Sequence, residues 1–479
     1  MLTRLKVNGF KNLVNVDVRF GPFTCIAGPN GVGKSNLFDA ILFLSALADQ
    51  PLLEAAASVR GEAAPASHPG HLFHSVGATR SSEMSFEAEM LVPPEGEDDL
   101  GQAARAAITF LRYRLELTLR DDAVHVHDER LDYITKGFAR RNLVFPHRPA
   151  WRNSVVIGRR TAPLISTTIE DGIRTILLHQ DQGEGYKGGG KPRPHSADRL
   201  PRTVLSTASA AEGATALLAR REMQSWRLLH LEPSAMRTPD PFRAKDSLSA
   251  NGAHLPATLA RITRAREGGP EEIALTRVAN RVAELVEDIR TLRIDIDERR
   301  ELLTLMLTSF DGTEHEARSL SDGTLRFLAL AVLQEDPQAH GLICLEEPEN
   351  GIHPRRIPAM LRLLNDIAFS PDEPVDAENP LRQVMVNTHS PAVIAQVDDA
   401  DLLLAQLQRV RIDDNICERP IFRCLRDTWR NHAEPQARTA TRGDLVMLLN
   451  PVPPQSETGQ SRVIDRDDFQ LSLPYQPVR

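Results

Sequence analysis

The stretch from Phe23 to Leu44, FTCIAGPNGVGKSNLFDAILFL, constrains the fold more than any other part of the sequence. It begins as a short apolar run with strand character, continues as a glycine-rich loop, and ends in a helical pattern with Leu37, Ile41 and Leu44 on one face. A glycine-rich loop that ends in Lys-Ser between a strand and a helix is the pattern of a phosphate-binding loop. The stretch therefore predicts an α/β fold with a nucleotide site, and not merely a flexible loop.

Each part of this loop has a distinct expected task. The glycines allow backbone N–H groups to turn towards phosphate oxygens, and the start of the following helix contributes the positive end of its dipole. We expect Lys34 to neutralise the β and γ phosphate oxygens and the hydroxyl of Ser35 to ligate magnesium. The residues expected to contact the nucleotide are Gly28, Asn30, Gly31, Gly33, Lys34, Ser35 and Asn36.

Composition excludes several other kinds of protein. The 479 residues are 41% hydrophobic and 25% charged, and no run approaches the roughly 20 consecutive apolar residues of a spanning helix. The first residues, MLTRLKVNGFKNL, indicate a strand and not a signal peptide, so we expect a cytoplasmic protein with no membrane partner. A net charge of −8 gives no overall footprint for nucleic acid, and four scattered cysteines favour neither disulfides nor zinc.

Three later segments combine apolar runs with polar residues. In SLSDGTLRFLALAVL, Ser319–Leu333, a small polar turn that ends in Gly323 precedes a helical pattern. GLICLEEP, Gly341–Pro348, is an apolar strand that ends in two acids, and a buried carboxylate is costly unless a cation compensates its charge. VMVNTHSP, Val384–Pro391, is an apolar strand followed by His389. Magnesium would supply the compensation that the paired acids need.

Taken in order, the loop and these three segments resemble the motifs of ABC-type ATPase heads of the SMC, RecF and OLD group. LSDGT at Leu320–Thr324 is similar to the LSGGQ signature of that group, with Asp322 and Thr324 as departures, and His389–Pro391 resembles its switch-histidine loop. The resemblance covers the N-terminal part of the chain and Leu302 to about Leu404. It implies a P-loop NTPase head of α/β fold, ABC-ATPase-like, with a mixed sheet and an inserted α+β region.

The resemblance also implies roles for the acids and the histidine. Glu347 takes the place of the catalytic base that polarises the attacking water. Glu346 takes the place of a magnesium-side aspartate, and its additional methylene implies a contact through water or a strand that is set slightly back. His389 takes the place of the residue that senses the γ-phosphate. The expected cofactors are ATP and Mg²⁺, and the expected activity is hydrolysis of ATP to ADP and phosphate.

Heads of this group resemble one another in mechanism, because each is incomplete alone. Ser321 and Gly323 of one copy would close on the γ-phosphate held by Lys34 of the other, so the resemblance implies a homodimer or a hetero-assembly. We expect a dimerising switch that acts on DNA or on a partner, such as a separately encoded nuclease or effector, in DNA repair or anti-phage defence. The alternative is a slow-turnover, ATP-gated nucleic-acid clamp or scaffold. A transporter ATPase and a fused TOPRIM nuclease are disfavoured, because the sequence offers neither a membrane segment nor a suitable DxD pair.

The segment between the two groups of motifs is expected to be compact. A long coiled coil would need sustained heptads, which the sequence lacks. We expect an N-terminal ATPase lobe at 1–92, an insertion and helical region at 93–300, a C-terminal ATPase lobe at 301–410, and an extension with a partly flexible tail at 411–479. The predicted elements are strands at Ser85–Val92 and Ala107–Leu119, an amphipathic helix at Glu271–Ile289, an edge element at Ala400–Gln406, and a short helix or turn from Arg442.

A basic segment leaves two interpretations open. Between Asp132 and Glu170 no acidic residue occurs, and the run contains Lys136, Arg140, Arg141, Arg148, Arg152, Arg159 and Arg160, interleaved with Phe138, Phe145 and Trp151. Cations with aromatics can neutralise phosphates and stack on bases, which indicates DNA. A solvated surface or a face for a protein partner fits equally well, and the same holds for a second basic run at Lys187–Arg202.

Two smaller features also have alternatives. His68, His71 and His74 recur every third residue, but an intervening Pro-Gly pair interrupts their shared helical face, so a metal site is the less favoured interpretation. Glu349 is either a residue that faces a partner subunit or part of a turn. For His353, capping or packing is favoured over metal binding.

Overall fold

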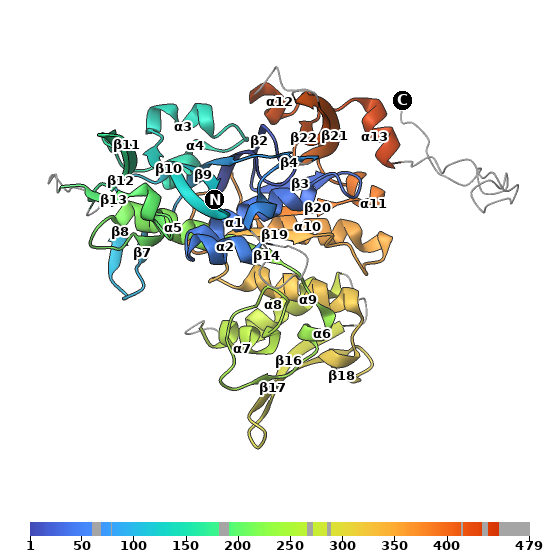
Figure 1. Ribbon diagram of the computed structural model, residues 1–479. Coiled ribbons are helices and arrows are strands. Elements are labelled where there is room, and N and C mark those ends of the chain that lie inside the picture. Colours follow the sequence, from blue (N-terminus) through green and yellow to red (C-terminus); the bar gives the residue numbers. More distant parts are fainter. Residues whose placement is uncertain are drawn as a thin grey trace, which may run out of the picture.

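The computed structural model describes residues 1–59, 69–77, 79–181, 191–265, 272–284, 289–412, 415–433 and 439–449 of the chain. Within them the chain forms a main body that contains two large sheets and, below it in Figure 1, a lobe of helices against a smaller sheet. The fold is α/β with a mixed sheet, as predicted. No helix among these residues is long and apolar enough to cross a membrane.

The helices of the described residues confirm most of the predicted ones. They are α1 (Lys34–Leu47), α2 (Leu52–Ser58), α3 (Lys136–Asn142), α4 (Pro149–Val155), α5 (Ala214–Gln224), α6 (Pro233–Met236), α7 (Leu255–Ala265), α8 (Glu272–Ala283), α9 (Asp322–Glu335), α10 (Ile357–Ile367), α11 (Pro391–Ile394), α12 (Trp429–Ala433) and α13 (Arg442–Leu449). Short 3-10 turns are η1 (Pro69–Leu72), η2 (Ala197–Arg199), η3 (Leu205–Thr207), η4 (Ala317–Ser319) and η5 (Pro354–Arg356). The helix predicted to reach Ile289 is too long, because α8 ends at Ala283 and Ile289 starts a strand with alternating polarity.

The nucleotide sheet holds the segments that carry the motifs. From edge to edge it consists of β14 (Arg227–Leu229), β19 (Gly341–Glu346), β20 (Arg382–Thr388), β3 (Phe23–Ala27), β21 (Leu402–Ile412) and β22 (Asn415–Cys424). The first five strands are parallel and β22 is antiparallel to β21. Because the carboxyl ends of parallel strands meet at one edge, the residues after β3, β19 and β20 converge there. The prediction of an edge element at Ala400–Gln406 is wrong, because β22 takes the edge position beside β21.

Both faces of the nucleotide sheet are covered. Along β19, Leu342 and Cys344 belong to one apolar core, while Ile343 and Leu345 belong to another. The first core also contains residues of α1, α5 and the second large sheet, and the other contains residues of α9 and α10. Strands that are buried on both faces read as continuous apolar runs, which is why these strands show no polar alternation in the sequence.

The second large sheet is antiparallel and joins the N-terminal strands to strands that follow α1. Its order is β13 (Arg193–Ser196), β12 (Ile173–Leu178), β11 (Ile165–Glu170), β10 (Ala123–Tyr133), β9 (Phe110–Arg120), β6 (Glu83–Leu91), β1 (Leu2–Asn8) and β2 (Val16–Arg19). β6 and β9 confirm the predicted strands. Two small ribbons pair β4 (Ser75–Val76) with β5 (Thr79–Arg80) and β7 (Glu95–Glu97) with β8 (Ala103–Arg105).

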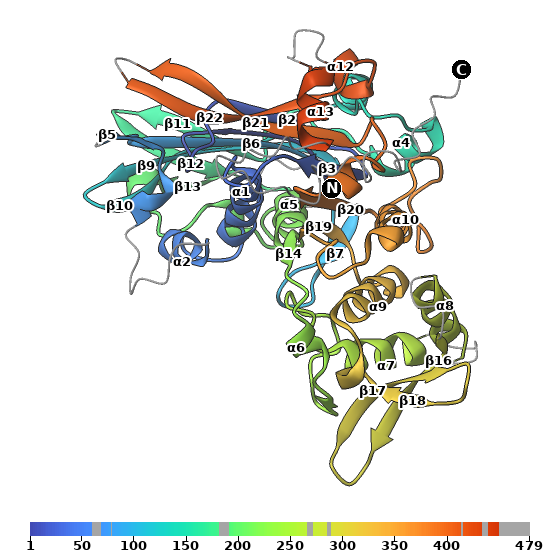
Figure 2. The same ribbon diagram turned by 90° about the vertical axis from the view of Figure 1, so that its right-hand side faces the viewer.

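The lower lobe in Figure 2 consists of α6 to α9 and a third sheet. In this sheet β17 (Leu302–Ser309) pairs with β16 (Ile289–Asp297), β15 (Asp240–Pro241) and β18 (Glu314–Glu316). The expected domain boundary at 300/301 falls in the turn between β16 and β17, the one at 410/411 falls inside β21, and the one at 92/93 falls between β6 and β9 of one sheet. The division into four domains stays a prediction.

Two aromatic residues of the basic segment lie inside the protein. Trp151 is fully buried and stacks on Phe369 with ring centroids 5.1 Å apart, and Phe145 packs edge-on against Trp151. The prediction that these rings interleave with exposed cations is therefore wrong for Phe145 and Trp151, because both belong to an apolar cluster with Trp429. Phe138 of α3, by contrast, is exposed.

Candidate nucleotide site

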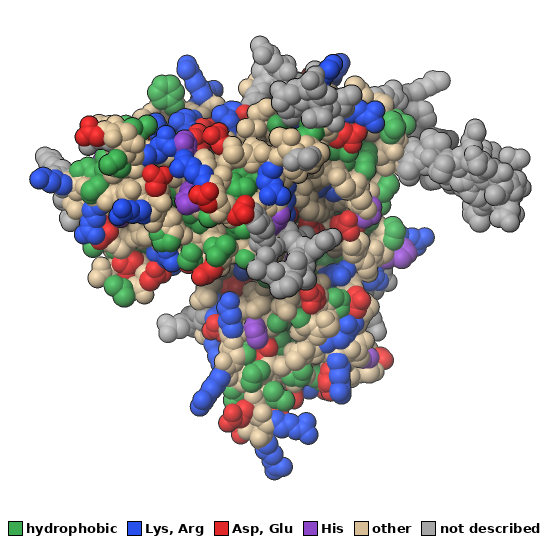
Figure 3. Space-filling view, in the orientation of Figure 1, with side chains coloured by type: hydrophobic (Ala, Val, Ile, Leu, Met, Phe, Trp, Pro, Cys, Tyr) green, Lys and Arg blue, Asp and Glu red, His purple; other side chains and the backbone are tan. Residues whose placement is uncertain are grey.

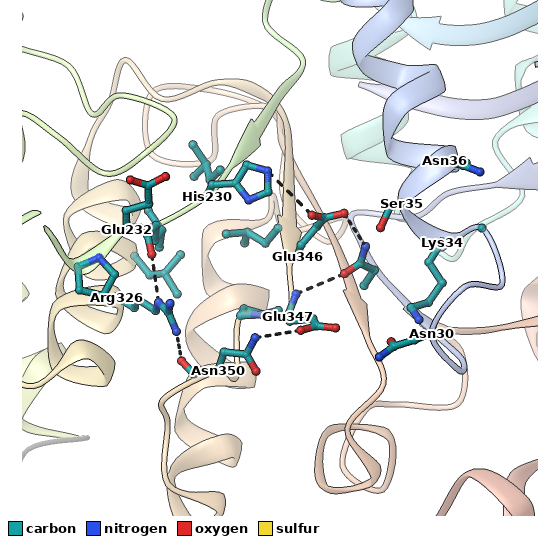
Figure 4. Close-up of a pocket in the computed structure, with 18 of the residues that line it drawn as sticks. Asn30, Lys34, Ser35, Asn36, His230, Glu232, Arg326, Glu346, Glu347 and Asn350 are labelled. Carbon is teal, nitrogen blue, oxygen red and sulfur yellow. Dashed lines mark hydrogen bonds and ion pairs between the residues drawn. The ribbon is translucent and has the colours of Figure 1, made fainter. Parts of the chain in front are cut away.

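A cavity of about 680 Å³ lies at the edge of the nucleotide sheet where β3, β14 and β19 end. Its walls come from the glycine-rich loop with the start of α1, from the turn after β19, from the segment 229–233 after β14, and from α9 (Figure 4). Six of the seven loop residues expected to contact nucleotide line it: Asn30, Gly31, Gly33, Lys34, Ser35 and Asn36. Gly28 lies behind the cavity wall, where its N–H donates to the carbonyl of Thr388 at 3.2 Å.

The loop conformation requires glycine at position 33. Gly33 has a φ of 109°, in the left-handed region, and precedes the first turn of α1. A Cβ atom there would lie 2.7 Å from the side-chain nitrogen of Asn12. Asn12 in turn accepts a 2.8 Å hydrogen bond from Asn36 Nδ2, so it supports the loop from outside the motif. Nothing in the sequence near Asn12 indicated this role.

Lys34 is buried within the loop. Its Nζ atom donates to the carbonyl oxygens of Gly28 and Pro29, at 2.7 and 2.8 Å. Burial lowers the pKa of Lys34, and the carboxylates of Glu347 and Glu346 act in the opposite direction. The ammonium group therefore has neutral acceptors beside it and two acids across the cavity.

Glu346 is the last residue of β19 and faces Ser35 across the cavity (Figure 4). Asn387 Nδ2 donates to Glu346 Oε1 at 3.2 Å, and His230 Nε2 lies 3.9 Å from Glu346 Oε2. A hydroxyl and a carboxylate that face each other are the hard oxygen donors that magnesium prefers. The donor set fits the predicted metal.

Glu347 follows the strand and is held on both oxygens. His389 Nδ1 lies 2.6 Å from Oε1, Asn350 Nδ2 donates to Oε2 at 2.9 Å, and the backbone N–H of Glu347 donates to Asn387 O at 2.9 Å. Its φ of 45° is uncommon for a residue other than glycine. The turn, and not strand alternation, separates its carboxylate from that of Glu346, because Glu347 lies outside β19.

The signature residues lie at the start of α9, apart from the loop. Ser321 caps this helix and accepts a bond from the N–H of Thr324 at 3.3 Å. A Cβ atom on Gly323 would lie 2.4 Å from the carbonyl oxygen of Gly351, so glycine is needed for this close contact. Neither Ser321 nor Gly323 lines the cavity, whose α9 residues are Arg326 and Leu330. The structure does not bring them to Lys34 of the same chain.

The departure from the signature pattern at Asp322 has a local partner. Arg237 Nη2 donates to Asp322 Oδ1 at 2.6 Å and to the carbonyl of Leu320 at 2.9 Å. Arg237 comes from the segment just after α6, so a residue far away in sequence neutralises the aspartate and orders the turn. The acid at position 322 is therefore compatible with a phosphate near this turn.

The polar cavity residues that were not predicted from the sequence include His230, Arg326 and Asn350. His230 follows the three-residue strand β14, which carries no motif and is placed by its pairing with β19. Arg326 donates to the carbonyls of Leu231 and Asn350 and thereby joins α9 to the segments after β14 and β19. For Asn350, the sequence offered one signal of a contact with Glu347, namely its position three residues later in the same turn.

The remaining predictions near the site have mixed outcomes. His353 caps η5 by accepting from the N–H of Arg355 at 3.2 Å, as favoured. Glu349 lies in the turn after β19 and is 8% exposed, which agrees with the turn alternative, while a position near a partner subunit stays a prediction. Its carboxylate is turned towards Thr388 of its own chain. The described residues contain no group of side chains that could hold a metal ion, and His68 lies outside them.

Fold and site together define a P-loop ATPase head, and known proteins agree. A family model described as "AAA domain, putative AbiEii toxin, Type IV TA system" matches residues 194–395, and a second, described as "AAA domain", matches residues 4–51. The matched segments contain the loop, the signature, the paired acids and His389. The matches indicate AAA-type ATPase domains over the segments that carry the motifs, and the order of these motifs resembles that of ATPase heads of the SMC, RecF and OLD group.

Individual relatives resemble the chain over different lengths. An OLD nuclease from Thermus scotoductus is 49% identical over 41 residues, which are 9% of this chain and 8% of that protein. Among solved structures, an SMC head bound to the C-winged helix domain of ScpA is 13% identical with a TM-score of 0.45, over 89% of this chain and 98% of that one. The SMC head domain from Thermotoga maritima is 13% identical with a TM-score of 0.37, over 88% and 97%.

Proposed function

We propose that the chain hydrolyses ATP in a magnesium-dependent reaction and that two such heads close on the nucleotide. One observation carries this proposal: the base candidate Glu347, bonded to His389, lies at the same sheet edge as Lys34 and Ser35. Lys34 would exchange its neutral carbonyl acceptors for phosphate oxygens, which are stronger acceptors because they are charged. We propose nucleotide contacts for Asn30, Gly31, Gly33 and Asn36 because they line the same cavity, whereas Gly28 does not line it.

The chain's own residues would divide the reaction between them. Ser35 and Glu346 would hold Mg²⁺, which neutralises charge on the β and γ phosphates when bound. Glu347 would accept a proton from the attacking water, and its bonds to His389 and Asn350 orient the carboxylate for this step. His389 would contact the γ-phosphate and so report whether it has been cleaved.

The signature requires a second copy. Ser321 and Gly323 lie at the N-terminus of α9, where unpaired backbone N–H groups and the helix dipole favour an anion. They do not line their own cavity, so a phosphate bound at Lys34 would meet the signature of another head. We propose that ATP joins two heads in this way, in a homodimer or a hetero-assembly.

Mixing two inactive variants tests this pairing. Ser321→Asp keeps a side chain that caps α9 but places a carboxylate towards the incoming phosphate, so turnover should be lost while ATP binding persists. Lys34→Met should lose ATP binding but retain a working signature. Equimolar mixing should restore about a quarter of wild-type turnover, because half of the pairs then contain one intact site out of two.

Steady-state phosphate release with magnesium, together with light scattering in ATP, measures both effects. Ser321→Asn is the matched control, because asparagine caps a helix as well as aspartate does without adding charge. If the mixed variants stay inactive although Ser321→Asp protein still binds ATP and both variants are folded, the composite site is wrong. If Ser321→Asp retains full turnover, the signature does not meet phosphate.

We propose DNA repair or anti-phage defence in the cytoplasm as the setting, with closing that acts on DNA or on a separately encoded effector. The OLD nuclease among the relatives supports a role near nucleic acid. A slow ATP-gated clamp or scaffold remains the second candidate, since the joined heads would hold a partner without turnover. The two differ in whether ATP must be cleaved, which the Glu347 variant described in the Discussion decides.

We propose that DNA contact through the basic segment depends on α3. Figure 3 shows Lys and Arg side chains over α3 near the top of the view, and Lys136, Arg140 and Arg141 are exposed there. Arg160 is largely buried against Asp181, so it is left intact. Changing the three exposed cations to glutamate should weaken DNA binding about 10-fold or more and lower its salt dependence.

The matched control changes Arg299 and Arg300 to glutamate. Both are exposed at the turn between β16 and β17, where Figure 3 shows cationic side chains at the bottom of the view. Fluorescence anisotropy with labelled duplex at several salt concentrations separates the two sets. If both sets of substitutions weaken DNA affinity equally, or if the α3 set does not weaken it, α3 is not a DNA-binding surface.

A further inference from the structure

Thr388 connects three segments of the nucleotide site. It is fully buried, and its carbonyl accepts from the N–H of Gly28 at 3.2 Å. Its hydroxyl accepts from the N–H of Ser390 at 2.9 Å and donates to Glu349 Oε1. The phosphate-binding loop, the histidine loop and the turn after β19 therefore meet at one side chain.

The carboxyl group of Glu349 is buried at a cost. It is 8% exposed, and Oε2 has no hydrogen-bond partner among the described residues. Burial raises the pKa of Glu349, and the bond from Thr388 opposes that shift. An unpaired polar atom in the interior is unfavourable, and an apolar side chain of similar length would avoid the penalty. Stability alone does not account for a glutamate at this position.

Two bonds between side chains join the turn after β19 to the end of β20 and the loop that follows it. The one between Glu347 and His389 is open to solvent, with side chains 30% and 45% exposed. The bond between Glu349 and Thr388 is buried. Its two residues are close neighbours in sequence of Glu347 and His389. A solvent-exposed pair is weakly held by itself, whereas a buried bond fixes the backbone on either side of it.

We propose that Glu349 is a positioning residue for hydrolysis, which fixes the histidine loop through Thr388 so that His389 stays bonded to Glu347. This inference rests on the proposed ATPase function. Glu349 itself contacts neither Glu347 nor His389 by a hydrogen bond among those found, and acts through the Thr388 hydroxyl. Its effect should therefore fall on the rate of hydrolysis and not on nucleotide affinity.

Four variants test the bond. Glu349→Met removes the acceptor but keeps the chain length, and Thr388→Val removes the hydroxyl but keeps the shape. The double variant combines them, and Glu349→Gln keeps an acceptor oxygen while it removes the charge. Thr203→Val is the matched control, because Thr203 is also fully buried, donates to Leu47 O at 2.9 Å and accepts from Ser206 N.

Glu349→Met and Thr388→Val should each lower kcat about 10- to 100-fold, with KM for ATP changed less than about threefold. The double variant should be no slower than either single variant, because both remove the same interaction. Glu349→Gln should stay close to wild type. Glu349→Met should keep or raise the melting temperature, whereas Thr203→Val should lower the melting temperature and leave kcat unchanged.

The melting temperature separates positioning from simple packing. A kcat of Glu349→Met near that of wild type, or losses that multiply in the double variant, would overturn the inference. If Thr388→Val does not fold, the contrast between Glu349→Met and Glu349→Gln decides alone. If the wild-type protein does not hydrolyse ATP, both the proposed function and this inference are wrong. If wild type is active and Glu347→Gln is inactive, a wild-type kcat in Glu349→Met contradicts the positioning role only.

Discussion

Changing Glu347 to glutamine is expected to lower ATP turnover by about 10²- to 10⁴-fold, the usual contribution of a general base. An amide of the same length cannot accept the proton of the attacking water. It can still accept one bond, from His389 or from Asn350, so the turn after β19 should keep its shape. ATP binding should persist, and the joined heads should accumulate because the nucleotide between them is not cleaved.

Single-turnover hydrolysis measures the rate, and light scattering in saturating ATP measures the pairing. Glu373→Gln is a suitable control, since Glu373 lies in the loop before β20 and lines a different cavity. Turnover within a few-fold of wild type would assign the base elsewhere. The same variant decides between the two proposed functions: a biological activity that survives in Glu347→Gln protein belongs to a clamp, and one that disappears requires hydrolysis.

The parts of the site that could be predicted are those that local sequence determines. The loop between β3 and α1 needs strand, glycines and helix within one short stretch, so its chemistry is readable without any distant contact. The acids at the end of β19 and the histidine after β20 could be grouped because parallel strands end at the same edge. The different roles that the resemblance implies for Glu346 and Glu347 have a structural counterpart, because Glu347 is a turn residue with a positive φ.

Other parts depend on pairings that the sequence does not encode locally. Asn12 supports Gly33 from a turn after β1, and His230 reaches the cavity because the short strand β14 pairs with β19. Arg237 neutralises Asp322 across a sequence separation of 85 residues. Trp151 could not be recognised as buried, because the partner ring of Phe369 arrives from another part of the chain. Long-range packing determines the position of each of these side chains, and no periodic pattern in the sequence indicates it.

Replacing Lys34 by methionine should lower ATP affinity about 100-fold or more, since removing one partner of a buried, charge-assisted bond costs several kcal/mol. Methionine keeps the unbranched stem, and Lys34 is 6% exposed, so the loop should retain its packing. The stability of the protein without ATP should change little, because the cost of burying an ammonium group is removed while the carbonyls of Gly28 and Pro29 lose their donor. Calorimetric titration with ATP and magnesium measures the affinity, and thermal melting measures the stability. Lys136→Met, on exposed α3, is the control.

The protons exchanged on binding give an independent check on Lys34. Burial lowers its pKa in the protein alone, and phosphate oxygens beside Nζ would raise the pKa again. The charged form is therefore favoured by ATP, and wild type should take up protons on binding in alkaline buffers near the lowered pKa. Calorimetry in two buffers with different ionisation enthalpies detects this uptake. If ATP affinity survives in Lys34→Met, Lys34 does not contact the phosphates. The same conclusion follows if proton uptake is lost in Lys136→Met but not in Lys34→Met.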